Sequence, residues 1–185
     1  DPYFNGQGPS TNYDFNGYPS SFIVGRGNLV AVQRFNCTNN TTAYDGNQSV
    51  WAELNGYNMA GAKAWVQDAA GHRTTVSYFD NFSIAANNNL NTLAYPSQVT
   101  DPDGNYSTFQ YNYDFGAVTR THAPTSGTVA AGNMTFVDEV RSYDAYGRLT
   151  QATNPTNNAY ARFVYETNGN YVHMYQTIID LTTNN

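Results

Sequence analysis

The sequence contains very little charge and almost no lysine. Asp, Glu, Lys and Arg make up 12% of its 185 residues, whereas about 25% is usual in soluble proteins. Lys63 is the one lysine, and the formal net charge is -6. A nucleic-acid-binding protein needs clustered Lys and Arg opposite the phosphates, and anionic lipid attracts basic segments. The composition therefore argues against nucleic acid and anionic membrane surfaces as partners.

Long hydrophobic runs are missing as well. No stretch reaches the roughly 18 apolar residues that suggest a transmembrane helix, so we expect no transmembrane segment. The chain starts at Asp1 without the basic and apolar regions of a secretory leader. We therefore expect that any signal peptide was removed or never formed part of this chain.

Cysteine is almost absent too. Cys37 stands alone, which excludes a disulfide within the chain. We expect a small apolar or surface side chain at this position, with a disulfide to another molecule as the alternative.

Asparagine, tyrosine and glycine are abundant instead. The chain has 25 Asn, 16 Tyr and 15 Gly. Asn and Gly favour tight turns because they tolerate positive φ, and Tyr and Thr favour strands. Strong helix formers are few. The composition predicts an all-β protein: antiparallel hairpins that form an open, curved sheet or a sandwich.

Three segments align by eye, at Val66–Asp80, Val99–Asp114 and Ala152–Glu166. Each has Asp or Asn at its third position, then a turn, then an alternating strand that ends on an aromatic and an acidic residue. The sixth position holds Gly71, Gly104 or Asn157. A hairpin turn needs positive φ there, which these residue types allow.

A second half-unit begins with Tyr-Asp or Tyr-Asn, followed by Gly and another alternating strand. Its copies are Tyr57–Asp68, Tyr113–Thr121 and Tyr143–Thr153. Repetition of one supersecondary unit indicates an architecture built by stacking that unit.

These residues carry a family resemblance. The core Tyr-Asp-x-x-Gly-Arg-Leu-Thr resembles the YD repeat of the Rhs family, in about four units between Gly27 and Asp180. The residues that match this core are Tyr143, Asp144, Gly147, Arg148, Leu149 and Thr150, and those that match the second half of the repeat are Thr100, Asp101, Pro102, Gly104 and Asn105. The further structural residues of the repeat motif are Tyr113, Asp114, Gly116 and Gly71. The resemblance implies spiralling antiparallel sheets in secreted or cell-surface proteins, of which the large members enclose toxins.

The two ends of the chain suggest how it associates. Residues 1–25 are rich in Gly, Pro, Asn and aromatics and predict an extended arm, followed by a single domain over residues 26–185. The stretch Tyr171–Ile179 predicts a strand at a sheet edge. Edge strands present unpaired N–H and C=O groups, and strand donation is a known recognition mode. The candidate anchors of the arm are Tyr3, Phe4, Tyr13, Phe15, Phe22 and Ile23.

Sites for catalysis or metal are not evident in the sequence. His72, His122 and His173 follow no metal-ligand spacing. The run Asp101-Pro102-Asp103-Gly104-Asn105 starts like a calcium loop but lacks the later Gly and Glu. No nucleophile elbow or phosphate-binding loop occurs. We expect no cofactor and no catalytic residues.

Seven Asn-x-Ser/Thr sequons are candidate glycosylation sites. They start at Asn36, Asn39, Asn40, Asn47, Asn81, Asn105 and Asn133. Four cluster within residues 36–49, a segment without strand alternation that we expect to be an exposed loop. An Asn/Thr-rich loop without glycans is the equally weighted alternative.

The leading hypothesis is an extracellular or cell-surface structural subunit. It would self-assemble through β-strand pairing or donation into a fibre or surface layer, with glycans on its surface. The alternative is a carbohydrate-binding YD-repeat module, or a fragment of a larger cell-surface or toxin-related protein. Such a module would stack sugars on Trp51 or Trp65. An enzyme such as a polysaccharide hydrolase ranks third, and it would need two carboxylates about 5–10 Å apart.

Overall fold

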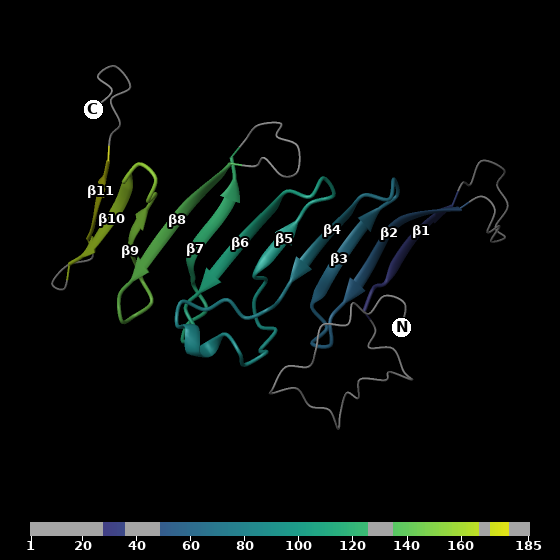
Figure 1. Ribbon diagram of the computed structural model, residues 1–185, viewed down its shortest axis with the longest axis horizontal. Helices are drawn as coiled ribbons and strands as arrows, with labels where there is room; N and C mark the ends of the chain where they lie inside the picture. The colour runs from purple at the N-terminus through teal and green to yellow at the C-terminus, as the bar shows by residue number, and fades with distance from the viewer. Residues whose placement is uncertain (1–27, 36–48, 126–134, 167–170, 178–185) are drawn as a thin grey trace, which may run out of the picture. The chain divides into compact units, whose positions relative to one another are not determined.

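The protein is all-β, as the composition predicts. A computed structural model describes residues 28–35, 49–125, 135–166 and 171–177. These residues form eleven strands, and the only helical turn among them is the 3-10 helix η2 (Ala85–Asn87) (Figure 1). No helix in this part of the chain is long and apolar enough to cross a membrane.

The chain groups into two compact units. Unit 1 comprises Asp1–Asp80 and Asn89–Gly104, and unit 2 comprises Asn81–Asn88 and Asn105–Asn185. Unit 1 contains β1 (Ala31–Phe35), β2 (Ser49–Tyr57), β3 (Lys63–Asp68), β4 (Arg73–Ser77) and β5 (Gln98–Thr100). Unit 2 contains η2, β6 (Tyr106–Tyr111), β7 (Val118–Pro124), β8 (Phe136–Tyr143), β9 (Leu149–Thr153), β10 (Tyr160–Tyr165) and β11 (Val172–Gln176). The sequence predicts one domain over residues 26–185; the arm predicted over residues 1–25 lies outside the described residues.

Within each unit the strands stand in chain order and pair antiparallel with their sequence neighbours. Hairpin follows hairpin, so each inner strand of a unit has the preceding and the following strand at its sides. The described strands of each unit belong to an open sheet, with no second sheet packed on it. The open sheet is thus confirmed, and the sandwich alternative is not adopted.

In three of the even-numbered strands that end on a tyrosine, the pairing register with the next strand shifts just before that tyrosine. The shifts fall between Gly56 and Tyr57 in β2, Gln110 and Tyr111 in β6, and Ser142 and Tyr143 in β8. A β-bulge at such a shift raises the local twist and re-aims the next side chain. The tyrosine is therefore placed in the same way at each of these turns.

Tyrosine hydroxyls tie strand ends to the strand that precedes them in the chain. Four donate to backbone carbonyl oxygens: Tyr57 to Leu29 at 2.8 Å, Tyr78 to Lys63 at 3.1 Å, Tyr143 to Val118 at 2.7 Å and Tyr165 to Leu149 at 2.9 Å. Each acceptor lies at or just before the start of that strand. A hydrogen bond of this kind contributes about 0.5–1.5 kcal/mol to stability.

The hydrophobic core of the described residues is small. The buried apolar side chains are Met59, Ala64, Trp65 and Leu93 in unit 1, and Phe82 and Tyr111 in unit 2. More than twice as many large apolar residues of the same ranges are exposed. A sheet stabilises a domain by burying a face against another layer, and much of this sheet's apolar surface is left uncovered.

Candidate functional site

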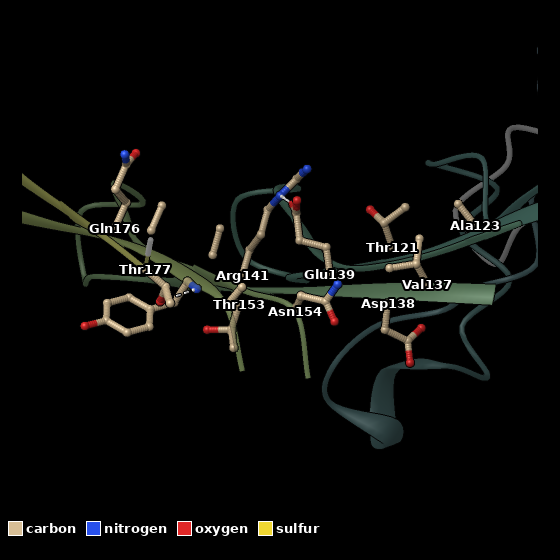
Figure 2. A pocket seen from close by; sticks show the side chains of 14 residues that line it. Thr121, Ala123, Val137, Asp138, Glu139, Arg141, Thr153, Asn154, Gln176 and Thr177 are labelled. Carbon is tan, nitrogen blue, oxygen red and sulfur yellow. Dashed lines mark hydrogen bonds and ion pairs between the residues drawn. The ribbon is translucent and has the colours of Figure 1, made fainter. Parts of the chain in front are cut away.

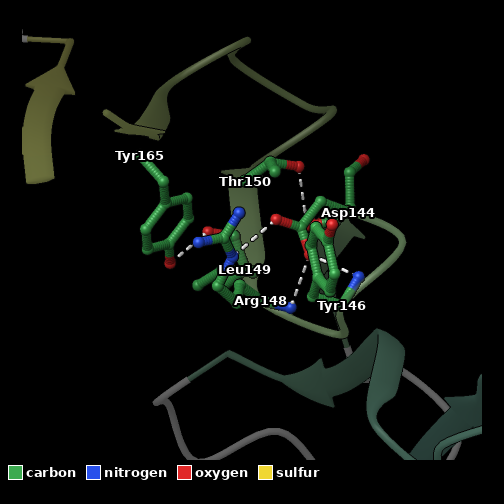
Figure 3. Close-up of polar contacts among 7 residues, drawn as sticks. Asp144, Tyr146, Arg148, Leu149, Thr150 and Tyr165 are labelled. Atoms are coloured by element: carbon green, nitrogen blue, oxygen red, sulfur yellow. Dashed lines mark hydrogen bonds and ion pairs between the residues drawn. The ribbon is translucent and has the colours of Figure 1, made fainter. Parts of the chain in front are cut away.

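The predicted repeat residues Asp144, Gly147 and Arg148 form a tight turn between β8 and β9 (Figure 3). Asp144 Oδ1 accepts the backbone N–H of Tyr146 at 2.9 Å and of Arg148 at 3.0 Å. The Arg148 guanidinium donates to Asp144 Oδ2 at 2.7 Å, and Gly147 has φ 76°. Desolvation raises the pKa of Asp144, but the hydrogen bonds from Arg148 and Tyr146, together with the charge of Arg148, leave that pKa below its ordinary value. Both carboxylate oxygens are thus occupied by turn contacts.

Arg148 also links this turn to the next hairpin. Its guanidinium lies 4.3 Å from the ring centre of Tyr165 and 5.2 Å from that of Tyr146. On the other side of the turn, a Cβ built on Gly147 would lie 3.5 Å from the Phe115 ring. The Gly-Arg pair of the repeat therefore sits between aromatic side chains, a packing role.

The turn between β3 and β4 repeats this arrangement. Asp68 Oδ1 accepts the N–H of Ala70 at 2.8 Å and of His72 at 2.9 Å, and His72 Nδ1 lies 3.0 Å from Asp68 Oδ2. The backbone hydrogen bond from His72 is the main reason that the pKa of Asp68 is lowered. Gly71 has φ 91° and Gly104 has φ 87°, so positive φ at these glycines is confirmed.

The predicted equivalence of Tyr113 and Asp114 to the Tyr143–Asp144 pair is wrong by two residues. Tyr111 follows the register shift in β6 and Asn112 opens the turn. Asn112 Oδ1, not the Asp114 carboxylate, accepts the N–H groups of Asp114 at 2.8 Å and Phe115 at 3.2 Å. Gly116 closes this turn with φ 70°. The loop is one residue longer than the Asp144 turn, and the Tyr113–Asp114 dipeptide on which the sequence comparison is based lies inside it.

The prediction for Asn157 is wrong by one position. Asn158 has φ 57°, whereas Asn157 does not have positive φ. The turn closes with the Asn154 N–H on the Ala159 carbonyl at 2.8 Å. This span is one residue longer than the span from Asp144 to Arg148, so the residue with positive φ moves one place along.

Two neighbouring strands of unit 2, β7 and β8, bring together an ion-pair cluster. Asp138 on β8 accepts from Arg120 Nη2 at 2.6 Å and lies 2.7 Å from His122 Nδ1, both on β7. The His122 ring stacks on Phe136 with ring centres 4.2 Å apart. The hydrogen bond from Arg120, and then that from His122, holds the pKa of Asp138 below its ordinary value. The sequence gives no sign of this cluster, because its members meet only through strand register.

A polar hollow of about 220 Å³ lies beside this cluster. Its lining residues are Asn81, Thr108, Gln110, Arg120 and His122. Among the residues that the structure describes, no group of three His, Cys, Asp or Glu side chains could hold a metal ion.

The opposite face of unit 2 carries a larger, shallower hollow of about 500 Å³ (Figure 2). Ala152 and Ala161 are paired across β9 and β10 and give it a floor of small side chains. Glu139 and Arg141 form an ion pair along it and lie on the side of the sheet opposite Asp138. Small side chains between longer ones account for the depression without any ligand.

Strand β11 forms the outer edge of unit 2. Among the described strands only β10 pairs with it, and all five of its side chains are exposed. Two backbone hydrogen bonds flank the pairing: Thr177 N–H to the Tyr160 carbonyl at 2.9 Å, and Glu166 N–H to the Tyr171 carbonyl at 3.2 Å. The predicted edge strand is confirmed.

The free backbone groups of β11 follow from this pairing. Antiparallel strands alternate between residues that bond to the neighbour and residues that face away. Val172, Met174 and Gln176 occupy the outward positions, because Tyr171 and Thr177 bond toward β10. Their N–H and C=O groups have no partner among the described residues, and they leave a template for another strand.

The two tryptophans differ sharply in exposure. Trp51 on β2 is 51% exposed, whereas Trp65 on β3 is 8% exposed and lies under the Arg73 guanidinium, 4.1 Å from its ring centre. Trp65 is therefore a core residue, and only Trp51 has a ring face that a ligand could reach.

Most assembly and glycosylation candidates lie outside the described residues. These are the arm anchors Tyr3, Phe4, Tyr13, Phe15, Phe22 and Ile23, and the sequons at Asn36, Asn39, Asn40, Asn47 and Asn133. Asn81 and Asn105 are described and half-buried. Asn81 Nδ2, the atom that would carry a glycan, donates to the Phe109 carbonyl at 2.8 Å. This contact makes Asn81 a poor acceptor.

No protein-family model and no curated protein matches this chain. Its class is therefore defined by the fold: an all-β protein of antiparallel hairpins in an open sheet. Within that class, its particular features are the tyrosine-tied turns and an unpaired edge at β11.

Proposed function

We propose that the protein is an extracellular structural subunit that self-assembles through β-strand pairing or donation into a fibre or surface layer. The observation that carries this proposal is the β11 edge, with outward N–H and C=O groups at three residues. Backbone groups of this kind are satisfied best by another β-strand.

The composition of the edge supports this function. Proteins that must stay monomeric guard such edges with Lys, Pro or inward charges. The sequence of β11, Val-His-Met-Tyr-Gln, contains none of these. Its exposed apolar side chains add surface that a second strand would cover.

Residues 1–25 are the proposed donor segment, because they are rich in aromatic residues and turn formers. The proposal includes membership of the YD-repeat class, no catalysis, and glycans on the Asn-rich segment at residues 36–49. A low-charge surface decorated in this way would keep an assembled polymer hydrated.

Deletion of residues 1–25 tests the proposed function. Negative-stain electron microscopy of the full chain should show filaments or sheets, and the deletion variant should be soluble and non-filamentous. The control is Tyr146→Ala, which changes an exposed aromatic outside the arm and the edge and should leave the polymer unchanged. Filaments formed by the deletion variant would contradict the proposed donor role of residues 1–25.

A carbohydrate-binding module is the second candidate, favoured by the exposed ring of Trp51. A Trp face can stack on a sugar ring. A glycan array should then show selective binding that Trp51→Ala abolishes and Trp51→Phe partly retains. An array without selective binding would exclude this candidate.

A further inference from the structure

We infer that β11 pairs with β11 of a second copy about a two-fold axis at Met174. This inference rests on the proposed function and gives the β11 edge its partner and register, so that residues 1–25 would pair with a different edge. In an antiparallel pair centred on Met174, Met174 lies opposite Met174 of the second copy. Val172 of each copy lies opposite Gln176 of the other. All three outward residues of the strand then lie in pairs that exchange two N–H···O=C hydrogen bonds.

This register is selected because it uses every free backbone group of the described strand. A two-fold axis at Val172 or Gln176 would leave two of the outward residues opposite residues beyond β11, and an axis at His173 or Tyr175 would leave one. Shifting one β11 strand by a single residue along the other would place outward residues opposite residues whose N–H and C=O groups already bond to β10. The axis at Met174 therefore gives the greatest number of hydrogen bonds within β11.

The side chains also fit this pairing. Met174 lies beside Phe163 of β10 in the observed register, so the two-fold axis creates a row of Phe163, Met174 and the same two residues of the second copy. Met174 is 58% exposed in the single chain and would be covered in the pair. Sulfur–aromatic and apolar cross-strand contacts of this kind are favourable.

The opposite side of the strand carries the ring residues His173 and Tyr175. In the pair each His173 lies beside Tyr175 of the second copy. The nearest charged group is Glu166, whose Oε1 lies 3.3 Å from His173 Nε2 within the same chain. Arg162 on β10 stands next to Tyr175 and would not meet its own copy across the axis. No like charges face each other directly.

Cysteine cross-linking tests the register, in a Cys37→Ser background that removes the native thiol. Residues in such a pair have Cα atoms about 5.5 Å apart, inside the range that a disulfide spans. Met174→Cys alone should form a disulfide-linked dimer on mild oxidation. Val172→Cys or Gln176→Cys alone should not, whereas a mixture of the two should. Self-linked Val172→Cys would overturn the register.

Proline substitution tests the interface itself. Met174→Pro removes an N–H that points away from β10, and edge strands tolerate proline on the outward side. At protein concentrations below those at which filaments form, sedimentation should then show a shift from dimer to monomer, with at least about a tenfold rise in the dissociation constant, and unchanged near-ultraviolet circular dichroism. Tyr175→Pro is the matched control: it removes an N–H used by β10, so it should lower the unfolding midpoint.

The outcomes separate this inference from the proposed function. A two-fold contact closes on itself, so a filament needs a second contact, which the proposed function gives to residues 1–25. Filaments of Met174→Pro with unchanged subunit spacing would overturn the β11 pair and leave the function standing. A full chain that stays monomeric at all concentrations would overturn both. A dimer that survives Met174→Pro would place the interface elsewhere.

Discussion

At the scale of single residues, tyrosine hydroxyls hold neighbouring strands together by hydrogen bonds, in a protein whose described residues form only a small hydrophobic core. The four tyrosines that bond to backbone carbonyls sit at the ends of β2, β8 and β10 and just after β4. Each joins the end of one strand to the start of its neighbour. With few buried apolar side chains, these bonds carry a larger share of the stability than usual.

Removing one of these hydroxyls should measurably weaken the fold. We expect Tyr143→Phe to lower the free energy of unfolding by about 0.5–1.5 kcal/mol, because the Val118 carbonyl loses its 2.7 Å donor. Urea titration followed by circular dichroism measures this. Tyr146→Phe is the control, since Tyr146 is 84% exposed and its hydroxyl forms no hydrogen bond with the described residues. Equal effects of the two changes would contradict the role of the bond.

Turn residues show how far the sequence predicts this fold. Gly71 and Gly104 were predictable because few residues other than Gly accept φ near 90°. The roles of Asn112 and Asn158 could not be predicted from a motif of fixed spacing, because their turns are one residue longer than the Asp144 turn. The polar residue that directly follows the last residue of a strand, Asn112 after Tyr111 or Asn154 after Thr153, would have been the better guide.

At the scale of the strand, β2 and β3 place their tryptophans in opposite environments. Trp65 pairs across to Gly56 on β2 and Thr75 on β4, where small neighbours leave room for a buried ring. Trp51 pairs with Gln33 on the edge strand β1. Sequence alternation identifies both as strand residues but cannot say which face is covered, because that depends on segments distant in the chain.

The two tryptophans should therefore respond differently to truncation. We expect Trp65→Ala to cost about 3–5 kcal/mol of unfolding free energy, because it leaves a cavity and an unstacked Arg73. Trp51→Ala should change it by no more than about 0.5 kcal/mol. Chemical denaturation of both variants gives the comparison. A strongly destabilised Trp51→Ala would mean that its ring is covered in solution.

The Asp138 cluster marks the limit of sequence reasoning at this scale. Arg120 and His122 are two residues apart and share one face of β7, but their partner lies on β8. Only the register between these strands brings the three together. Register follows from turn lengths, which the sequence motifs misjudge by one residue in two of the hairpins.

At the scale of the whole molecule, scarcity of charge sets how assembly should respond to solvent. Only 8 Lys and Arg and 14 Asp and Glu occur in 185 residues. An association held by backbone hydrogen bonds and apolar contacts has little charge to screen. Ion-pair interfaces weaken as the Debye length falls from about 10 Å at 0.1 M salt to about 3 Å at 1 M.

We therefore expect the assembled state to survive high salt and dissolve in urea. Light scattering should stay constant or rise between about 0.1 and 1 M NaCl, since screening leaves apolar and backbone contacts intact. Moderate urea should lower it, because urea solvates peptide groups. The substitution Met174→Lys adds charge at the edge and should make association sensitive to salt. Dissociation of the unmodified protein by salt alone would contradict this account.

The chain-order arrangement of strands has a consequence for how the protein is made. Within each unit the described strands pair only with the strands just before and after them, so we expect each new hairpin to dock soon after it is synthesised. Each new pairing closes only a short loop, so the entropy cost of loop closure is divided into small steps. Each unit's sheet would then grow during translation, with every newly synthesised strand added at the edge formed by the strand before it.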